Sequence, residues 1–581
     1  MTQGNGTVKV DVAIIGGGPG GSTTGSLIKK YNPDLSVLIL EKEQFPRDHV
    51  GESQLPAIAP VLQEMGAWQA IEAADFPIKI GATYTWGKTT EPWIFEFVPI
   101  ERIPPQAEIE RPGKYEDWRL QTAFQVDRAV YDDVLLKHAA KLGCDVRQST
   151  RVAEVLTTDD HIDGLKLDSG EVIRATHYVD ASGNAAILRR AMDVSCEVPT
   201  KLKNVAFWDY WENREWADAD DVKATRVHIR SLAFGWLWWI RLSPTRVSIG
   251  LVCPGEYFKT CGKKPAELYE EAVRSEKTYQ DRLRNAKQRG KVEGTTDWSF
   301  VVERTYGENW FLVGECAGFA DPILAAGLTL THVGARDLAY TILELERGEF
   351  ERDWLVERYD ELQTRRVRQH MKFADFWYSA NGIFEDIREH CTEIAAEAGF
   401  KLDPVQAFRW LSQGGLGDDF VGQAGIGGHD LASMKQVMMR MTEGNHGWMI
   451  DGKTHFELNL ANAKEGTLGV PVEGRIHRVR SWTRKGQTLA EVGIQKFVIE
   501  ALRQTNEAGK FMQVLAALVA KRYPKPEEHK VAVHHAVQVL EALAQQYWVI
   551  CDTKKKHPAM RISSPEEGQY IHSDRGEATV I

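Results

Sequence analysis

Hydrophobic residues near the N-terminus follow two patterns in succession. Residues 10–15 form a short apolar run of the kind that fits a strand buried in a parallel sheet. A glycine turn follows, and helix spacing begins near Pro19 and continues to about Lys30. The next apolar run, at residues 35–40, predicts a second strand. The start of the chain therefore predicts a βαβ unit.

Further apolar runs lie in the middle of the chain. The stretch GWLWWIRL at residues 235–242 fits a strand in which Trp236 and Trp238 share one face. Such a strand would belong to a packed sheet core or would form an aromatic wall. Residues 311–313 predict another strand, which runs into a loop and then into a helix that starts near Gly327.

The later part of the chain is predominantly helical in its pattern. From Glu351 onward apolar residues recur at helix spacing, and three further helix-like runs near the C-terminus end in a strand-like piece. The glycine-rich residues 413–428 follow no buried strand, so they are interpreted as a loop or hinge. These patterns predict an α/β body over residues 1–380 and a mostly helical or winged-helix-like appendage over residues 381–581. The polar composition of about the last 20 residues predicts disorder.

The composition is that of an ordinary globular protein and argues against several classes of function. The 581 residues carry a formal net charge of −11, which disfavours a general affinity for nucleic acid, and the basic residues within 475–485 are interpreted as a solvated face. The seven cysteines are scattered without metal-ligand spacing, as is typical of a reduced cytoplasmic protein. No secretory signal and no run long enough to cross a membrane is evident, so we expect a cytoplasmic protein without membrane insertion.

The glycine turn of the first βαβ unit carries a nucleotide-binding pattern. Gly16, Gly18 and Gly21 form G-x-G-x-x-G, and Glu41 stands at the end of the second strand. In this pattern the first glycine permits a tight turn, the second lets the backbone approach a pyrophosphate, and the third allows the helix to pack closely on the strand. The helix N-terminus faces the anion and the acidic residue reaches a ribose. The alternative is a purely structural glycine turn.

Several segments together resemble the flavin-dependent halogenases, a branch of the aromatic flavin monooxygenase superfamily. The resemblance covers about the first 380 residues, and the chain looks most like the branch found in chloramphenicol biosynthesis. It rests on the glycine pattern and on the segments FPRDHVGESQLP, IKIGATYTWG, QVDRAVYDDVLL, GWLWWIRL and GECAGFADPILAAG. The fold that it implies is α/β: a Rossmann-like FAD-binding domain with an inserted β-sheet substrate domain at roughly residues 190–300, as in aromatic flavin monooxygenases.

The resemblance implies a reaction as well as a fold. In the family, FAD arrives reduced and reacts with O2 to give a C4a-hydroperoxide, which chloride or bromide attacks in place of an aromatic ring. The resulting hypohalous acid travels through a tunnel to a lysine, which the match of IKIGATYTWG identifies as Lys79. An ammonium there would polarise hypohalous acid by hydrogen bonding, whereas a desolvated amine would form a haloamine. Without the resemblance, Lys79 would be interpreted as an ordinary structural lysine.

The other residues of the site are also implied by the resemblance. Tryptophans of the family's W-x-W-x-I-P signature lie near the flavin and are thought to keep the substrate away from the hydroperoxide, and halide is held by backbone amides. The residues implied in this way are Arg128, Glu315 and Asp321 for the cofactor, Ala326 and Gly327 for the halide, and Trp236, Trp238 and Glu52 for the active-site wall. Asp321 is also a candidate for covalent attachment of FAD.

Four positions depart from the family pattern. Arg241 replaces the proline of the tryptophan signature, Glu315 replaces an aspartate, and Ala325 replaces a serine beside the halide amides. Leu324 stands where tryptophan halogenases carry a catalytic glutamate, which favours a phenol or a pyrrole over free tryptophan. The changes at Arg241, Glu315 and Ala325 leave a related flavin-dependent monooxygenase or reductase as an alternative. A flavin-holding protein with a binding or regulatory role is a third hypothesis.

The partners follow from the same observations. Because only one dinucleotide pattern is present, NAD(P)H has no evident site, and a separate flavin reductase is expected to supply reduced FAD. The expected substrate is an electron-rich aromatic small molecule, free or tethered to a carrier protein as a thioester. The sequence thus predicts a natural-product halogenase with no metal, no nucleic acid and no membrane partner.

Overall fold

The chain forms two compact units in a computed structural model. The described residues are 6–86, 92–98, 100–198, 203–218, 223–296, 299–379, 448–484, 487–554 and 557–562. The first unit comprises Met1–Pro92, Pro104–Asp375 and Pro471–Ile476, and the second comprises Trp93–Ile103, Phe376–Val470 and His477–Ile581. The predicted loop or hinge at residues 413–428 and the predicted disordered tail lie outside the described residues.

The glycine pattern follows the carboxyl end of β1, an interior strand of a mainly parallel sheet in the first unit. Strand β1 pairs in parallel with both β2 and β9, and the order across the sheet is β6-β2-β1-β9-β8-β7 with β18 on β9. The expected βαβ unit is present, because β1, α1 and β2 follow one another along the chain. The strands are β1 (Thr7–Ile15), β2 (Val37–Leu40), β6 (Asp145–Arg147), β7 (Val152–Thr158), β8 (His161–Leu167), β9 (Val172–Asp180) and β18 (Trp310–Leu312).

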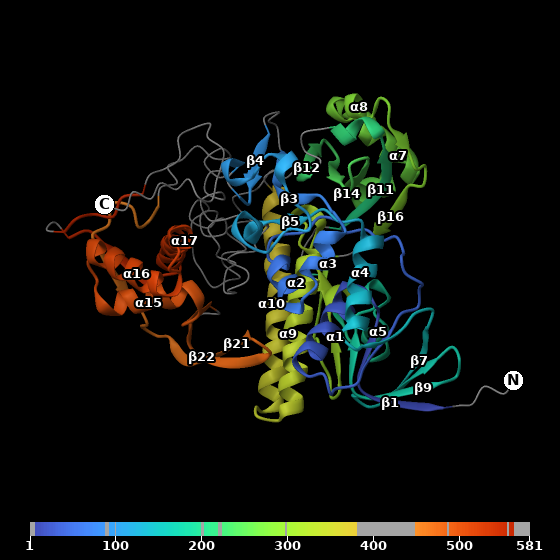
Figure 1. Cartoon of the computed structure of the whole chain (residues 1–581), viewed down its shortest axis with the longest axis horizontal. Coiled ribbons are helices and arrows are strands. Elements are labelled where there is room, and N and C mark those ends of the chain that lie inside the picture. The colour runs from blue at the N-terminus through green and yellow to red at the C-terminus, as the bar shows by residue number, and fades with distance from the viewer. Residues whose placement is uncertain are drawn as a thin grey trace. The chain divides into compact units, whose positions relative to one another are not determined.

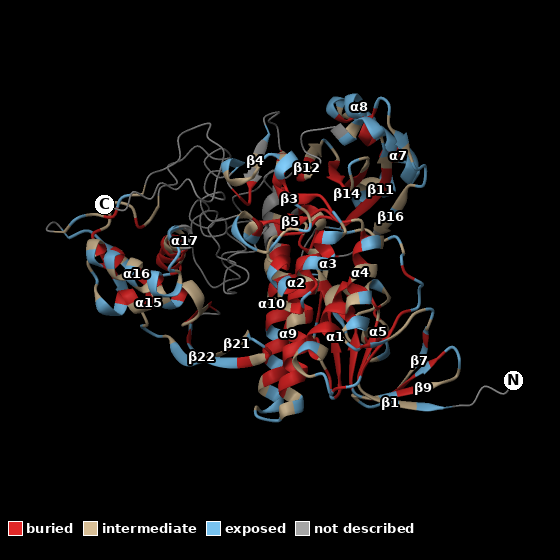
Figure 2. Ribbon diagram, viewed as in Figure 1, coloured by how far each residue is buried: buried red, intermediate tan, exposed pale blue. Residues whose placement is uncertain are grey.

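Helices cover this sheet, and α1 packs against both α4 and α9 (Figure 1). Figure 2 shows buried residues gathered on α1, on α9 and on the strands beside them. The predicted helix near Gly327 is α9, and the helical pattern after Glu351 is α10. The helices of this part are α1 (Pro19–Tyr31), α2 (Ile58–Met65), α3 (Trp68–Ala73), α4 (Arg128–Lys141), α5 (Ile187–Ala191), α9 (Gly327–Arg347) and α10 (Arg352–Ser379).

A second, largely antiparallel sheet of the first unit corresponds to the predicted substrate side. Its order is β15-β11-β14-β13-β12-β3, with β16 on β11 and β5 on β3. One face packs on α7 (Pro265–Ser275) and α8 (Lys277–Leu283) through a core that includes Leu237 and Trp239. The strands are β3 (Ile78–Thr85), β5 (Ala123–Phe124), β11 (Asn204–Glu212), β12 (Ala224–Leu232), β13 (Gly235–Arg241), β14 (Arg246–Pro254), β15 (Lys287–Gln288) and β16 (Glu293–Thr296).

Within its described residues, the C-terminal unit combines three helices with two small sheets around a core of its own. The three helix-like runs near the C-terminus are confirmed as α15 (Gly493–Gln504), α16 (Ala508–Arg522) and α17 (Pro526–Gln545). Its strands are β20 (His455–Leu458), β23 (Gln487–Ala490), β24 (Val549–Asp552) and β4 (Trp93–Glu96), together with most of β21 (Lys464–Val472) and β22 (Arg475–Arg484), whose adjoining ends belong to the first unit. The shorter elements of the first unit are α6 (Gly255–Thr260), β10 (Cys196–Glu197), β17 (Phe300–Val302) and β19 (Gly318–Phe319).

Two classes of feature are absent from the described residues. None of their helices combines the length and the apolar character needed to cross a membrane. Nor do they contain a group of three or more His, Cys, Asp or Glu side chains arranged to hold a metal ion.

Candidate active site

A cavity of about 930 Å³ lies in the first unit and is lined from both of its large sheets. The lining from the parallel sheet includes the glycine turn and Glu41, and the lining from the second sheet includes Trp236 and Trp238. Residues 47–53, called here the 47–53 segment, contribute seven consecutive lining residues. The cavity therefore brings together most of the residues that the sequence singled out.

The nucleotide end of the cavity is built by backbone in close contact. Gly16 has φ +105°, and a Cβ atom on Gly21 would lie 2.0 Å from the Gly16 carbonyl oxygen, so neither position accepts a larger residue. Helix α1 starts at Pro19 with no acidic residue in its first turn, which leaves its N-terminal amides available to an anion. A Cβ atom on Gly18 would lie 3.5 Å from the Arg47 guanidinium, so a positive charge also borders this position.

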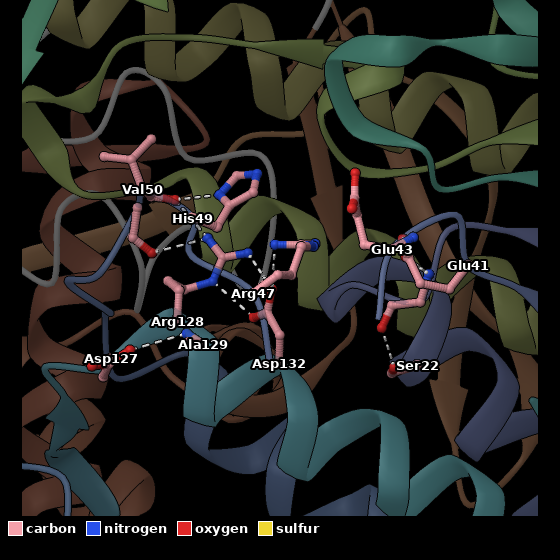
Figure 3. A network of polar contacts seen from close by, with 12 residues as sticks. Ser22, Glu41, Glu43, Arg47, His49, Val50, Asp127, Arg128, Ala129 and Asp132 are labelled. Carbon is pink, nitrogen blue, oxygen red and sulfur yellow. Dashed lines mark hydrogen bonds and ion pairs between the residues drawn. The ribbon is translucent and has the colours of Figure 1, made fainter. Parts of the chain in front are cut away.

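Glu41 is the acidic residue expected at the ribose. Its side chain is buried and lines the cavity. One carboxylate oxygen accepts hydrogen bonds from the Gly17 N–H at 2.7 Å, and the other accepts from the Glu43 N–H at 2.8 Å (Figure 3). These bonds hold the glycine turn against the end of β2 and keep the carboxylate at the cavity wall.

Arg128 holds the 47–53 segment by hydrogen bonds to its backbone carbonyls. Its guanidinium donates to the Val50 carbonyl at 2.7 Å and to the Gly51 carbonyl at 3.2 Å, and it forms a two-point contact with Asp132 at 2.8 and 2.9 Å. Figure 3 shows Arg128 between that segment and Asp132, with Arg47 on the other side of the same carboxylate. Arg128 lines the cavity, but its hydrogen bonds go to protein groups, so it shapes the wall of the cofactor site.

The sheet end of the cavity is an aromatic wall. Trp236, Trp238 and Ile240 alternate along β13 and line the cavity, whereas the intervening Leu237 and Trp239 lie in the core on the other face. This is the alternation expected of a strand. The two tryptophan rings have centroids 6.0 Å apart. The run GWLWWIRL is thus a packed core on one face and an aromatic wall on the other.

Glu52 lies at the sheet end, where it is buried and lines the cavity. Burial raises the pKa of Glu52 to about 7, and hydrogen bonding with the nearby Ser248 and Tyr210 hydroxyls opposes this rise. Its Oε2 atom is buried without a hydrogen-bond partner among the described residues. A carboxyl group of this kind exchanges a proton near neutral pH.

Lys79 lies on β3 and is buried, with 1% of its surface exposed. Its Nζ donates to the Gln54 carbonyl at 2.8 Å, and burial lowers the pKa of Lys79 to about 7. Lys79 is not among the residues that line the cavity. The residue that accepts its hydrogen bond directly follows Glu52 and Ser53, which do line the cavity.

The remaining predicted residues lie around the start of α9. Glu315 and Gly327 line the cavity, and Ala326 is the buried residue that precedes the first turn of α9. Ala325 has φ +54°, which places a non-glycine residue in the left-handed region immediately before these amides. The side chain of Leu324 lies outside the described residues.

Asp321 occupies a different position from the other predicted cofactor residues. Its side chain is buried and is not part of the cavity lining. It accepts hydrogen bonds from the Ile323 N–H at 2.9 Å and from Asn204 at 3.1 Å. Its described contacts stabilise the loop that leads to Ala325 and the start of α9.

Sequence reasoning missed several residues of the cavity. Arg47 and His49 lie within a segment that carried the resemblance, but their places at the cavity wall depend on how Arg128 holds that segment. Tyr210, Ser248 and Gly250 do not line the cavity, but they lie on the strands that support its aromatic wall, where only the pairing register of β11, β13 and β14 brings them together. No local pattern signals them.

The residues present fit an FAD molecule. The glycine turn, the α1 N-terminus and Arg47 suit a pyrophosphate, and Glu41 suits a ribose. The cavity then continues past Glu315 to the aromatic wall, where a planar ring system would meet Trp236 and Trp238.

Most of the chain is similar to proteins of known function. The model of the tryptophan halogenase family matches residues 11–111 and 106–387. The 1H-pyrrole-2-carbonyl-peptidyl-carrier-protein chlorinase of Pseudomonas fluorescens is 30% identical over 407 residues, which cover 68% of this chain and 88% of that enzyme.

Two solved structures extend the comparison. The myxobacterial chondrochloren halogenase CndH, described as a variant of FAD-dependent halogenases, is 27% identical with a TM-score of 0.58 and covers 69% of this chain and 93% of its own. The flavin-dependent halogenase CmlS covers 97% of this chain and 99% of its own, with a TM-score of 0.69 at 21% identity. The second likeness shows that the fold is shared over nearly the whole length.

Proposed function

Because the chain belongs to the tryptophan halogenase family and is a flavin-dependent halogenase, we propose that it uses reduced FAD, O2 and halide to make hypohalous acid, which Lys79 transfers to an electron-rich aromatic ring. The observation that supports this proposal is the position of Lys79. A buried amine with a pKa near neutrality is hydrogen-bonded to Gln54, the residue that follows the 47–53 segment of the cavity lining.

The cofactor supplies the oxidising chemistry when it is bound in its reduced form and meets oxygen. Gly16, Gly18 and the start of α1 would hold its pyrophosphate, and Glu41 its ribose. The backbone amides of Ala326 and Gly327, at the start of α9, would hold the halide. Ala325 lacks the hydroxyl of the serine that it replaces, but amide donors do not depend on that side chain.

Lys79 has two chemical forms available near neutral pH, because its pKa is about 7. The ammonium would donate a hydrogen bond to hypohalous acid and make its halogen more electrophilic. The amine would instead react with hypohalous acid to form an N–halogen bond and release water. In either form the halogen is transferred to a ring carbon, and that carbon loses a proton.

The proposed substrate is a phenol or a pyrrole, either free or tethered to a carrier protein. The relative from Pseudomonas fluorescens acts on a pyrrole held by a peptidyl-carrier protein, which supports the tethered form. We expect a separate reductase to supply reduced FAD, and a cytoplasmic location. The changes at Arg241, Glu315 and Ala325 leave one alternative open, a flavin-dependent monooxygenase or reductase that does not halogenate.

The first experiment tests halide dependence and the role of Lys79 together. The flavin of the purified full chain is reduced without oxygen and then mixed with oxygenated buffer, with chloride, with bromide or without halide. An electron-rich phenol reports halogen transfer within the protein, and excess taurine traps hypohalous acid that escapes. The proposal requires halide-dependent formation of halogenated phenol, whereas an oxygenated product indifferent to halide supports the monooxygenase.

Lys79→Met is expected to lower phenol halogenation by about 100-fold or more, while total hypohalous acid stays within about threefold of the parent protein. The reason is that the variant removes the amine but leaves the cavity lining intact. Lys137→Met, which changes an exposed lysine of α4, serves as the control. Phenol halogenation by Lys79→Met at the parent rate would remove the proposed role of Lys79.

A further inference from the structure

The turn that leads into α9 holds one residue in an unfavourable backbone conformation. This segment, called here the 321–327 turn, begins at Asp321, contains the 3-10 helix Pro322–Leu324 and ends at Gly327, the first residue of α9. Within it Ala325 has φ +54°, a left-handed conformation that costs free energy for a residue with a Cβ atom. Such a conformation persists only where the surrounding contacts hold it.

Ile323, two residues before Ala325, is held at both of its backbone polar groups. Its N–H donates to the Asp321 carboxylate at 2.9 Å, and its carbonyl accepts from the Tyr84 hydroxyl at 3.2 Å. The N–H of Ala325 donates back to the Pro322 carbonyl at 2.9 Å and closes the turn. Because the peptide units on both sides of Ile323 are fixed, the path of the chain into Ala325 is fixed as well.

Tyr84 belongs to β3, the strand that also carries Lys79. In the register of β3 and β12, Tyr84 pairs with Ile229, which lines the cavity. Paired residues of adjacent strands share one face of the sheet, so Tyr84 lies on the face that borders the cavity. Its side chain is buried and is not part of the lining, so it acts on the site through Ile323. Burial also raises the pKa of Tyr84, so the hydroxyl keeps the proton that it donates.

A second anchor of the 321–327 turn comes from another strand of the same sheet. Asn204, the first residue of β11, donates to the other carboxylate oxygen of Asp321 at 3.1 Å. The Ser299 hydroxyl donates to the Ala320 carbonyl, directly before the turn. These contacts hold the start of the turn, whereas Tyr84 holds its middle.

We propose that Tyr84 is a positioning residue for halide: its hydroxyl fixes the 321–327 turn, so that the amides of Ala326 and Gly327 keep the direction needed to hold a halide ion. The inference rests on the proposed function, which assigns halide to those two amides. Because β3 carries both Lys79 and Tyr84, one strand then fixes the lysine and the halide turn relative to each other.

The test compares bromide affinity with FAD affinity in the full chain. Oxidised FAD is bound first, and bromide is then titrated at constant ionic strength while the absorbance and fluorescence of the flavin are recorded. Tyr84→Phe keeps the ring and removes only the hydroxyl. We expect this variant to bind bromide about 3- to 10-fold more weakly, the effect of losing one hydrogen bond of ordinary strength, with FAD affinity within about twofold of the parent protein.

Turnover should divide in the same way between bromide binding and chemistry. The KM for bromide should rise by about 3- to 10-fold in Tyr84→Phe, while kcat at saturating bromide stays within about threefold of the parent value. The reason is that excess bromide selects the molecules in which the turn is ordered. A general loss of stability would instead lower kcat and the FAD content together.

A second substitution tests whether the strained residue transmits the effect. Glycine adopts positive φ without the Cβ penalty, so Ala325→Gly favours the observed turn even when the Tyr84 hydroxyl is missing. The double variant Tyr84→Phe/Ala325→Gly should therefore recover bromide affinity to within about threefold of the parent protein.

Tyr269→Phe is the matched control. It removes a buried hydroxyl that donates to the Ile249 carbonyl at 3.3 Å, on the face of the same sheet that packs against α7 and α8. Because the hydrogen bond that is lost has nearly the same length but lies away from the 321–327 turn, bromide affinity should stay at the parent value.

Two results would overturn the inference. The first is parent-like bromide affinity in Tyr84→Phe, which would show that the turn is held without the hydroxyl. The second is a loss that Ala325→Gly fails to recover or that Tyr269→Phe shares, which would assign the effect to general packing. A parent protein that binds bromide but makes no halogenated phenol would contradict the proposed function and leave this binding test intact.

Discussion

The two ends of the cavity are built in opposite ways. At the nucleotide end, the glycine turn and the α1 N-terminus present backbone atoms, and side chains are excluded by contacts as short as 2.0 Å. At the sheet end, buried side chains of β11, β12, β13 and the 47–53 segment form the wall. The nucleotide end suits the pyrophosphate and ribose of FAD, which many flavoproteins bind. Glu52 and Lys79, whose pKa values lie near neutrality, belong to the sheet end.

We therefore expect FAD binding to depend mainly on the nucleotide end and reactivity mainly on the sheet end. A backbone site depends on conformation, so a single added methyl group should abolish it. A wall of side chains on strands depends on register and on hydrogen bonds, so substitutions there should change reactivity more than they change FAD affinity. Variants at each end can therefore test whether the two functions are independent.

The largest effect is expected for Gly21→Ala at the nucleotide end. The new Cβ atom would lie 2.0 Å from the Gly16 carbonyl oxygen, and neither atom can move away without a backbone shift that separates α1 from β1. We expect a destabilisation of about 3 kcal/mol or more and a protein purified without FAD. Thermal unfolding and the flavin absorbance of the purified protein measure these effects.

Gly25→Ala is the matched control for that variant. It lies on the same helix, but its Cβ atom would meet only side-chain atoms, the nearest being the Cys144 sulfur at 3.1 Å. The alanine also favours the helix, so we expect a change of less than about 1 kcal/mol and normal FAD content. Equal losses in the two variants would show that α1 is generally intolerant and that the glycine turn is not special.

A more selective effect is expected for Gly250→Ala at the sheet end. Its Cβ atom would overlap the Trp238 ring, which would have to leave its place over β14 and lose the Ser248 contact. We expect halide-dependent turnover to fall by roughly 10- to 100-fold, with FAD affinity reduced only a few-fold. Stopped-flow kinetics measure the turnover rate, and FAD titration of the same preparation measures the FAD affinity.

Gly294→Ala makes a milder clash on the same sheet. Its Cβ atom would lie 2.9 Å from the ring of Phe207, which belongs to the core on the face that packs against α7 and α8. Stability should fall without a selective loss of turnover. If Gly250→Ala instead lost FAD as completely as Gly21→Ala, the separation between binding and chemistry would be wrong.

The same contrast explains how much of the site could be predicted from the sequence. The glycine pattern and Glu41 act through local spacing, and the shared face of Trp236 and Trp238 follows from the period of a strand. Ser248 could not be found in this way, because it meets Trp238 only through the register of two strands. The burial of Lys79 also escaped prediction, because one lysine in an apolar segment does not reveal what packs over it.

The smallest effect is expected where the 47–53 segment meets the second sheet. Asp48 forms an ion pair with Arg289 at 2.6 Å, and both side chains are about two-fifths exposed. Because Asp48 lines the cavity, this pair holds the segment over the space that FAD would enter. An exposed pair contributes at most about 1 kcal/mol, so Arg289→Gln should speed FAD dissociation by up to about fivefold.

The dissociation rate of FAD, measured by the recovery of its fluorescence, tests this last expectation. The effect should shrink as salt is raised, because salt already weakens the pair in the parent protein. Arg304→Gln breaks an ion pair with Asp160 of nearly equal exposure, and neither residue lines the cavity, so it should leave the rate unchanged. If Arg289→Gln releases FAD at the parent rate at low salt, the exposed ion pair with Asp48 does not hold the 47–53 segment. The buried hydrogen bonds of Arg128 would then be what fixes that segment between the two ends of the cavity.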